Sequence, residues 1–242
     1  MTTPVTHYLC VKEFHQQFGH ASPETIDQEV FNSNPKLVKL RYDLIAEEIK
    51  ELHDAFSNHD MIEVADALAD ILYVVHGAGV AFGIDLDQYY ECKYIKPLNV
   101  NYEVFDREEL MGFECIKFIE RDLGELDKAF KMKSMELTTH ALCHLLYAVY
   151  FMGTFCGLDL DVLFRIVHAN NMSKLCKNEQ AAIDSVISYK TKEGFENVKV
   201  AYRLSADGKY YVVYNAETGK VLKSMYWVEP DFSEYFGKEE NS

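Results

Sequence analysis

The sequence predicts an all-α fold in which two similar helical hairpins pack as a four-helix bundle, followed by a small antiparallel β meander. Three observations support this prediction. The chain contains an internal repeat, each copy has apolar residues at helical spacing, and the residues near the C-terminus change to the alternation typical of strands.

The repeat aligns residues 44–87 with residues 118–161 without a gap, at an offset of 74 residues, and 16 of the 44 aligned positions are identical. Each copy is expected to form two helices joined by a turn. A helical hairpin with one apolar face is not stable alone, so the two copies should pack together as a pseudo-dimer within one chain.

The helices of the first copy are predicted at residues 36–57 and 61–82. Apolar residues recur every three or four positions in the first helix, and the second helix is apolar along most of its length. Asp60 is a suitable N-cap for the second helix, and Gly83 is a suitable end for it. The pattern therefore predicts a tight hairpin with one shared apolar face.

Three segments near the C-terminus alternate apolar and polar residues, at 198–204, 209–215 and 220–227. The Asp-Gly and Thr-Gly pairs between them predict turns, so the segments should form the meander. The predicted domain organisation follows the repeat. It comprises a first repeat (1–96), a connector (97–111), a second repeat (112–176) and a C-terminal helix with the meander (177–236).

Composition excludes some functions. The net charge of −15 argues against nucleic-acid binding, because a phosphate backbone would be repelled. The six cysteines are scattered without a CxxC pair, which favours reduced thiols and a cytoplasmic location. The first residues lack the pattern of a leader peptide, and no apolar stretch is long enough to suggest a membrane span.

Acidic side chains of the first copy are predicted to meet along the seam between its two helices. They are Glu47, Glu48, Glu51, Glu63, Asp66 and Asp70. The helical rise places Glu51 level with Asp66, and Glu47 or Glu48 level with Asp70. The alternative is a solvated acidic face, which would account for Glu47. It does not account for Asp66 and Asp70, which interrupt the most apolar helix of the chain, so we expect a divalent cation to balance their charge. Oxygen ligands favour Mg²⁺, with Mn²⁺ also possible.

At these residues the sequence resembles the MazG-like all-α nucleoside triphosphate pyrophosphohydrolases, a superfamily that includes phosphoribosyl-ATP pyrophosphohydrolases and dimeric dUTPases. Its signature is an ExxE pair followed by an ExxD pair, here Glu48–Glu51 and Glu63–Asp66. The segments VKEFHQQFG (11–19), VHANNMSK (167–174) and TGKVLKSMYW (218–227) are also similar to the family.

The resemblance implies a Mg²⁺-dependent enzyme that cleaves a nucleoside triphosphate between the α- and β-phosphates, giving a monophosphate and pyrophosphate. Carried over, the metal ligands would be Glu48, Glu51, Glu63 and Asp66, with Asp70 as an additional or supporting ligand. Glu47 or Glu48 would orient or deprotonate water. Asn171 and Lys174 would face the substrate. Lys220 and Lys223 would contact phosphate, or would be solvated lysines of a hairpin.

The second copy departs from this signature. It keeps acids at two positions, Asp122 and Glu125, but where the first copy has Glu63, Asp66 and Asp70 it has Leu137, His140 and His144. The first copy, in turn, lacks the NMSK sequence of the second. A fused pseudo-dimer would therefore have one working site, with metal ligands from copy one and phosphate contacts from copy two. Further homodimerisation is also possible.

Three other hypotheses remain open. The protein could bind nucleotides without hydrolysing them, it could bind zinc through the HALCH segment (140–144), or it could be an interaction scaffold. His140 and His144 are four residues apart and share a helix face, as zinc ligands do, but Cys143 points elsewhere. We expect these histidines to be packed and hydrogen-bonded within the bundle.

Overall fold

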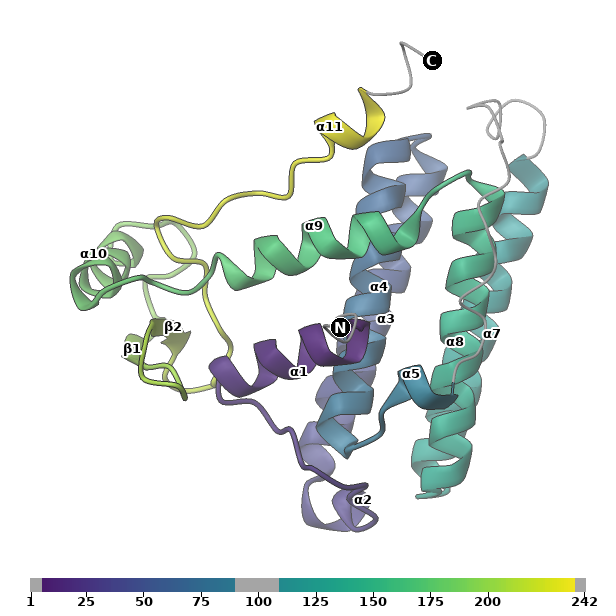
Figure 1. Cartoon of the computed structure of the whole chain (residues 1–242), viewed down its shortest axis with the longest axis horizontal. Helices are drawn as coiled ribbons and strands as arrows, with labels where there is room; N and C mark the ends of the chain where they lie inside the picture. The colour runs from purple at the N-terminus through teal and green to yellow at the C-terminus, as the bar shows by residue number, and fades with distance from the viewer. Residues whose placement is uncertain (1–5, 90–108, 238–242) are drawn as a thin grey trace, which may run out of the picture. The chain divides into compact units, whose positions relative to one another are not determined.

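The structure is a computed structural model that describes residues 6–89 and 109–237 (Figure 1). The chain divides into two compact units. Unit 1 comprises Met1–Lys12 and Ser22–Val167, and unit 2 comprises Glu13–Ala21 and His168–Ser242. Most of the predicted connector, residues 97–108, lies outside the described residues, whereas residues 109–111 form the start of a helix.

Unit 1 contains the predicted helical bundle. Helix α3 (Pro35–Ser57) forms a hairpin with α4 (Met61–Phe82), and α7 (Glu109–Lys131) forms a hairpin with α8 (Met135–Phe155). The hairpins pack together through α3 against α7 and through α4 against α8 (Figure 1). The start and end of α7 lie 74 residues after those of α3, so the repeat seen in the sequence is a repeat of structure.

The backbone details of the two hairpins repeat at the same offset. The turn residues His59 and Lys133 both have positive φ angles, of 57° and 54°, in the left-handed region. Each precedes an N-cap, Asp60 in the first copy and Ser134 in the second, whose side chain accepts hydrogen bonds from the first turn of the next helix. The two copies therefore use equivalent turn and capping geometry.

The ends of the second helices are also equivalent. Gly83 and Gly157 have φ angles of 76° and 71°, which a side chain would disfavour. One turn earlier, a Cβ on Gly79 would lie 2.9 Å from the Leu86 side chain, and a Cβ on Gly153 would lie 2.6 Å from the Leu160 side chain. Glycine at these positions allows the chain that follows each helix to pack closely against it.

Helix α4 is the core of unit 1. Among the described residues, α4 is the one helix that is by itself long and apolar enough to cross a membrane. However, 83% of its most apolar 18-residue stretch is buried inside the protein. Val64, Leu68, Ile71 and Leu72 have no exposed surface. Burial against neighbouring helices explains this apolar character.

The remaining helices of the first part of the chain are short or cross the boundary between units. Helices α2 (Val30–Ser33) and α5 (Leu86–Tyr89) have four residues each. Helices α1 (His7–Gln17) and α9 (Leu160–Met172) begin in unit 1 and end in unit 2. Within unit 1, Phe164 of α9 stacks on the ring of His7 at 3.9 Å between centroids and on the ring of Tyr73 at 5.5 Å.

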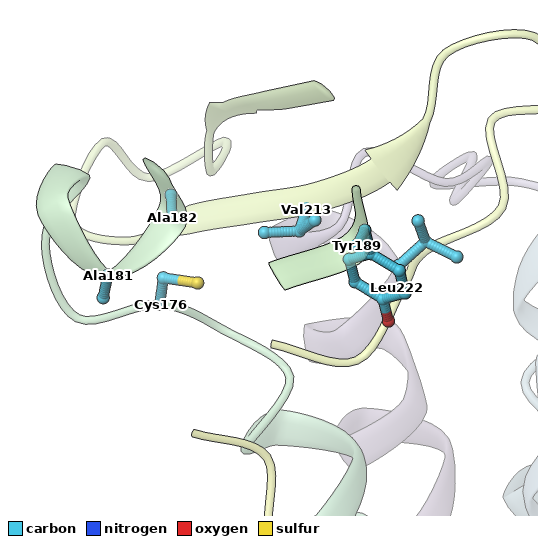
Figure 2. Packing of buried hydrophobic residues seen from close by; sticks show 6 residues of the cluster. All are labelled: Cys176, Ala181, Ala182, Tyr189, Val213 and Leu222. Carbon is cyan, nitrogen blue, oxygen red and sulfur yellow. The ribbon is translucent and has the colours of Figure 1, made fainter. Parts of the chain in front are cut away.

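Unit 2 packs α10 (Glu179–Tyr189) against two antiparallel strands, β1 (Val200–Leu204) and β2 (Tyr211–Asn215). Figure 2 shows the buried cluster that joins them, in which Tyr189 of α10 lies near Leu222 and Val213. A short helix, α11 (Ser233–Phe236), follows near the C-terminus. The mainly helical fold with a small antiparallel sheet confirms the predicted fold class.

The third segment of the predicted meander, residues 220–227, is shorter than expected. It pairs with β2 through a single bridge between Val221 and Tyr214. Beyond that bridge, the hydroxyl of Tyr189 donates a hydrogen bond to the carbonyl of Lys223 at 2.8 Å. The backbone is thus bound to a side chain of α10 and does not extend the sheet.

Candidate metal and nucleotide site

The acidic residues of the first copy lie on the two helices of one hairpin. Asn34 caps α3 by accepting a hydrogen bond from the Leu37 N–H, and a proline at the first helical position follows it. Asp60 caps α4 by accepting from the N–H groups of Ile62 and Glu63, both at 3.1 Å. These caps fix where each helix begins, and helical spacing then determines which acids face the partner helix.

Glu48 lies at the centre of the acidic cluster. Burial and neighbouring negative charges raise the pKa of its carboxyl to about 8. The neighbouring charges, in order of decreasing effect, are those of Asp70, Glu51, Glu47 and Asp66. Two acids of α3 and two acids of α4 therefore lie close enough to shift the pKa of the Glu48 carboxyl. This agrees with the acidic seam that the sequence predicted.

The donor set of this cluster fits a hard divalent cation. All of its candidate ligands are carboxylate oxygens, which Mg²⁺ and Mn²⁺ prefer. Within the described ranges, no three His, Cys, Asp or Glu side chains are already gathered as a metal-binding group. The side chains of Glu47 and Glu51 are exposed, so they can change rotamer at little cost to reach a cation.

Glu63 occupies a different environment from the other predicted ligands. Its side chain is exposed, and its charge is not among those that raise the pKa of Glu48. It belongs to the first turn of α4, whereas Asp66 and Asp70 are half-buried further along the same helix. Its role as a metal ligand stays a prediction from the ExxD pattern.

The predicted substrate-binding residues of the NMSK segment lie at the end of α9 in unit 2. Asn171 is buried, and its side-chain oxygen accepts a hydrogen bond from the Lys174 ammonium at 2.5 Å. The adjacent Ser173 accepts a hydrogen bond from the Val228 N–H at 3.3 Å, and the Asn170 amide donates to the Val228 carbonyl. These contacts hold the segment in one conformation.

The two lysines predicted near the C-terminus differ from each other. Lys220 is exposed on the loop between β2 and the bridge at Val221. The Lys223 ammonium lies 3.4 Å from the centroid of the Trp227 ring, a cation–π contact. Phosphate binding by Lys223 would compete with this contact, and the two predictions about these lysines stay open.

The carboxylates and the predicted phosphate-binding residues fall in different units of the chain. Glu48 and its neighbours belong to unit 1, whereas Asn171, Lys174, Lys220 and Lys223 belong to unit 2. A single site that combines both groups stays a prediction from the family pattern.

The acids that the second copy retains have local partners. Asp122 is buried and accepts hydrogen bonds from Nε and Nη2 of Arg121 at 2.9 and 2.8 Å. Glu125 pairs with the Lys128 ammonium at 2.6 Å. Each of these two acids is therefore paired with a basic side chain of its own helix.

The expectation that the HALCH histidines pack within the bundle is wrong. His140 and His144 are exposed on α8, on the face that carries the half-exposed side chains of Tyr147 and Phe151. The sequence identified their shared face correctly but did not show that this face is turned to solvent. In the part of the chain that the structure describes, they belong to no cluster of potential metal ligands.

One charged residue of α3 is buried although its burial was not predicted from the sequence. Arg41 of α3 is only 6% exposed. Its signal in the sequence is its position between Val38 and Ile45 in the apolar stripe of the helix, where a charged residue interrupts the pattern.

A comparison with known protein families finds a match over the region that contains this helical hairpin and its acids. Residues 11–92 match the family of phosphoribosyl-ATP pyrophosphohydrolases, which is part of the MazG-like nucleotide pyrophosphohydrolase superfamily. The matched region contains α3, α4 and all of the predicted metal ligands.

A relative similar over nearly the whole chain is the uncharacterized protein L479 of Acanthamoeba polyphaga mimivirus. The two chains are 41% identical over 238 residues, which cover 95% of each, so they belong to one family. No solved structure matches the chain.

Proposed function

We propose that this protein is a Mg²⁺-dependent nucleotide pyrophosphohydrolase, with Mn²⁺ as a possible substitute. It would cleave a nucleoside triphosphate between the α- and β-phosphates to give the monophosphate and pyrophosphate. The family match supports the general class of nucleotide pyrophosphohydrolase. The observation that carries the proposal is the convergence of acids from α3 and α4 of the first repeat, while their second-repeat equivalents are replaced or locally paired.

In this proposal Glu48, Glu51, Glu63 and Asp66 would hold the cation, with Asp70 supporting them. When bound, the cation would neutralise phosphate charge and lower the pKa of a coordinated water. Glu47 is exposed one residue before Glu48, and it would accept the proton of the attacking water. The Lys174 ammonium would bind a phosphate oxygen in exchange for its contact with Asn171.

The loss of acids in the second repeat also suits a second function, nucleotide binding without turnover. We favour hydrolysis because the ExxE and ExxD pairs of the first repeat are complete. We also propose a cytoplasmic location, which is supported by the free thiols of the five cysteines that the structure describes.

The test is pyrophosphate release from a panel of nucleoside triphosphates, with product identification, in the presence of Mg²⁺, Mn²⁺ or a chelator. We expect release with either metal for the wild type and background release for Glu63→Gln. If both proteins release pyrophosphate only at the background rate but still bind nucleotides, hydrolysis is contradicted and nucleotide binding without turnover is supported.

A further inference from the structure

Arg41 is a buried guanidinium for which the described residues provide no hydrogen bond or ion pair. Its side chain lies in the buried stripe of α3, and of its three guanidinium nitrogens Nε is the one that is fully enclosed without an acceptor. Burial lowers the pKa of this guanidinium to about 10, which reflects the cost of removing its charge from water. An unpaired buried charge is strongly destabilising, so its presence requires a reason.

Packing of the fold does not supply that reason. The equivalent position in the second repeat, 74 residues later, is Cys115 on α7, which is 2% exposed. The same helix can therefore pack at this place with a small uncharged residue. The first repeat has both the arginine and the acids of its second helix. The second repeat lacks the arginine and has lost those acids. Arg41 thus accompanies the acidic cluster rather than the helical fold.

The helix geometry places Arg41 on the side of α3 that carries Glu48. The two residues are seven positions apart, so they lie about 20° apart around the axis and about 10 Å apart along it. His53 and Phe56 mark the side toward α7, because their rings lie 5.8 and 5.1 Å from that of Phe113. Phe56 is about 60° around the helix from Arg41. His53 is about 120° around the helix from Arg41. Arg41 therefore lies closer to the line of the acids than to the side that contacts α7.

The facing helix continues the same line. The residue count that pairs Glu48 with Asp70 across the hairpin pairs Arg41 with Gly77. Tyr73, which is 6% exposed, lies between Asp70 and Gly77 on one face of α4. Between the acids and the level of Arg41, the residues that α4 contributes to the seam are thus Tyr73 and Gly77, and neither is a carboxylate. This part of the seam lacks the carboxylates that would hold a polyphosphate through a cation.

We propose that Arg41 is a substrate-binding residue that donates hydrogen bonds to a carbonyl oxygen of the nucleobase. This inference rests on the proposed function, in which the acids hold the phosphates through a cation. The nucleoside would then extend along the seam by about two helical turns, to the level of Arg41. A guanidinium binds keto oxygens well, as in its pairing with the O6 and N7 acceptors of guanine, whereas adenine presents an amino donor at the equivalent place.

The experiment measures binding of the nucleoside part and of the pyrophosphate part separately. It uses the products of the proposed reaction, which are not cleaved further. Calorimetry in Mg²⁺ would measure the affinities of UMP, GMP, AMP and pyrophosphate for the wild type, Arg41→Cys and Arg41→Lys. Arg41→Cys introduces the residue that the second repeat has at this position. Lys117→Cys, at an exposed basic residue of the second repeat that pairs with an exposed acid, is the control. Melting temperatures would be recorded for each protein.

We expect the wild type to bind UMP and GMP more tightly than AMP. Arg41→Cys should weaken UMP and GMP by about tenfold or more, because it removes a charged hydrogen-bond donor from the base carbonyl. Its affinities for AMP and pyrophosphate should stay within about twofold. Arg41→Lys should recover part of the loss. The melting temperature of Arg41→Cys should be unchanged or higher, since an unpaired buried charge is removed.

An equal loss of pyrophosphate and UMP affinity would assign Arg41 to phosphate and overturn the inference. A lower melting temperature without a selective loss would assign it a structural role, which also overturns it. If the wild type binds none of the four compounds, both the inference and the proposed function fail. If base-selective binding depends on Arg41 but no triphosphate is hydrolysed, only the catalytic proposal fails.

Discussion

At equivalent places in the two repeats, Glu48 lies among four other carboxylates, whereas Asp122 accepts two hydrogen bonds from the Arg121 guanidinium. The helices that carry them begin and end at equivalent residues. The fold is thus determined by features that both copies keep, namely the apolar stripe, the caps and the glycines. The chemistry depends on a few positions that the second copy has changed.

The comparison also shows where a charge is tolerated. In the second copy each retained acid has a basic neighbour on its own helix, so its charge is balanced locally. In the first copy the acids of α3 and α4 repel one another, and Arg41 is not among the charges acting on Glu48. The first copy therefore maintains destabilising groups that the second copy shows to be unnecessary for folding. Such groups are typical of functional sites.

The largest expected difference between the copies concerns metal affinity. Glu48→Gln should weaken Mn²⁺ binding by about tenfold or more, because it removes a carboxyl ligand that a bound cation would ionise, at the centre of the cluster. Asp122→Asn, at the equivalent position, should leave Mn²⁺ affinity within about twofold. Electron paramagnetic resonance of free Mn²⁺ measures both affinities. Equal losses would show that both repeats contribute ligands.

A smaller effect is expected where the copies are alike. Gly79→Ala and Gly153→Ala each introduce a Cβ closer than 3.0 Å to a leucine side chain, at 2.9 and 2.6 Å. Each substitution should lower the free energy of unfolding by about 1–3 kcal/mol, as overpacking does. Urea denaturation gives the two values. A large loss at one glycine and none at the other would contradict the equivalent packing of the two hairpins.

Asp87 is expected to make a pH-dependent contribution to the stability of the first repeat. Burial tends to raise the pKa of its carboxyl, but the charge of His76 and hydrogen bonds from Thr6 and the Tyr8 N–H lower it below the ordinary value of 3.8. A carboxyl with a lowered pKa stabilises the fold above pH 3.8, and this contribution is lost as the pH falls through the folded-state pKa.

Asp87→Asn should therefore lower the free energy of unfolding at pH 7 by about 1 kcal/mol. The difference from the wild type should shrink as the pH is lowered below 3.8. Denaturation curves at several pH values measure this. A difference that is constant with pH would show that the charge of Asp87 does not contribute.

The smallest effect is expected at the exposed histidines of the second repeat. His140→Ala and His144→Ala should each change the free energy of unfolding by no more than about 0.5 kcal/mol, as is usual for surface substitutions. Metal analysis of the purified wild type should find no stoichiometric zinc. Stoichiometric zinc that is lost in His140→Ala would contradict the interpretation of this repeat as the one without a metal.

Helix positions in unit 1 could be predicted closely, because periodicity, caps and the repeat all indicate the same residues. The shortened third segment of the meander could not, since it depends on the contact between Tyr189 and the carbonyl of Lys223, which are distant in sequence. The shared face of His140 and His144 follows from their spacing. Its exposure depends on which neighbours cover each helix, and the sequence does not contain that information.

The candidate site was predicted to a similar extent. The spacing of the acids was sufficient to bring Glu48, Asp66 and Asp70 to one seam, because a hairpin fixes which residues are level. Arg41 was missed because a single arginine in an amphipathic helix is normally expected at the surface. Its burial depends on which neighbouring elements cover that side of α3, and the sequence of α3 alone does not show this.

The most direct test of the central claim compares two glutamates at equivalent positions, Glu51 and Glu125. Pyrophosphate release from the best triphosphate substrate would be measured for the wild type, Glu51→Gln and Glu125→Gln. The one-site account predicts a loss of about 100-fold or more for Glu51→Gln and wild-type activity for Glu125→Gln. Equal losses in the two variants, or full activity in Glu51→Gln, would contradict it.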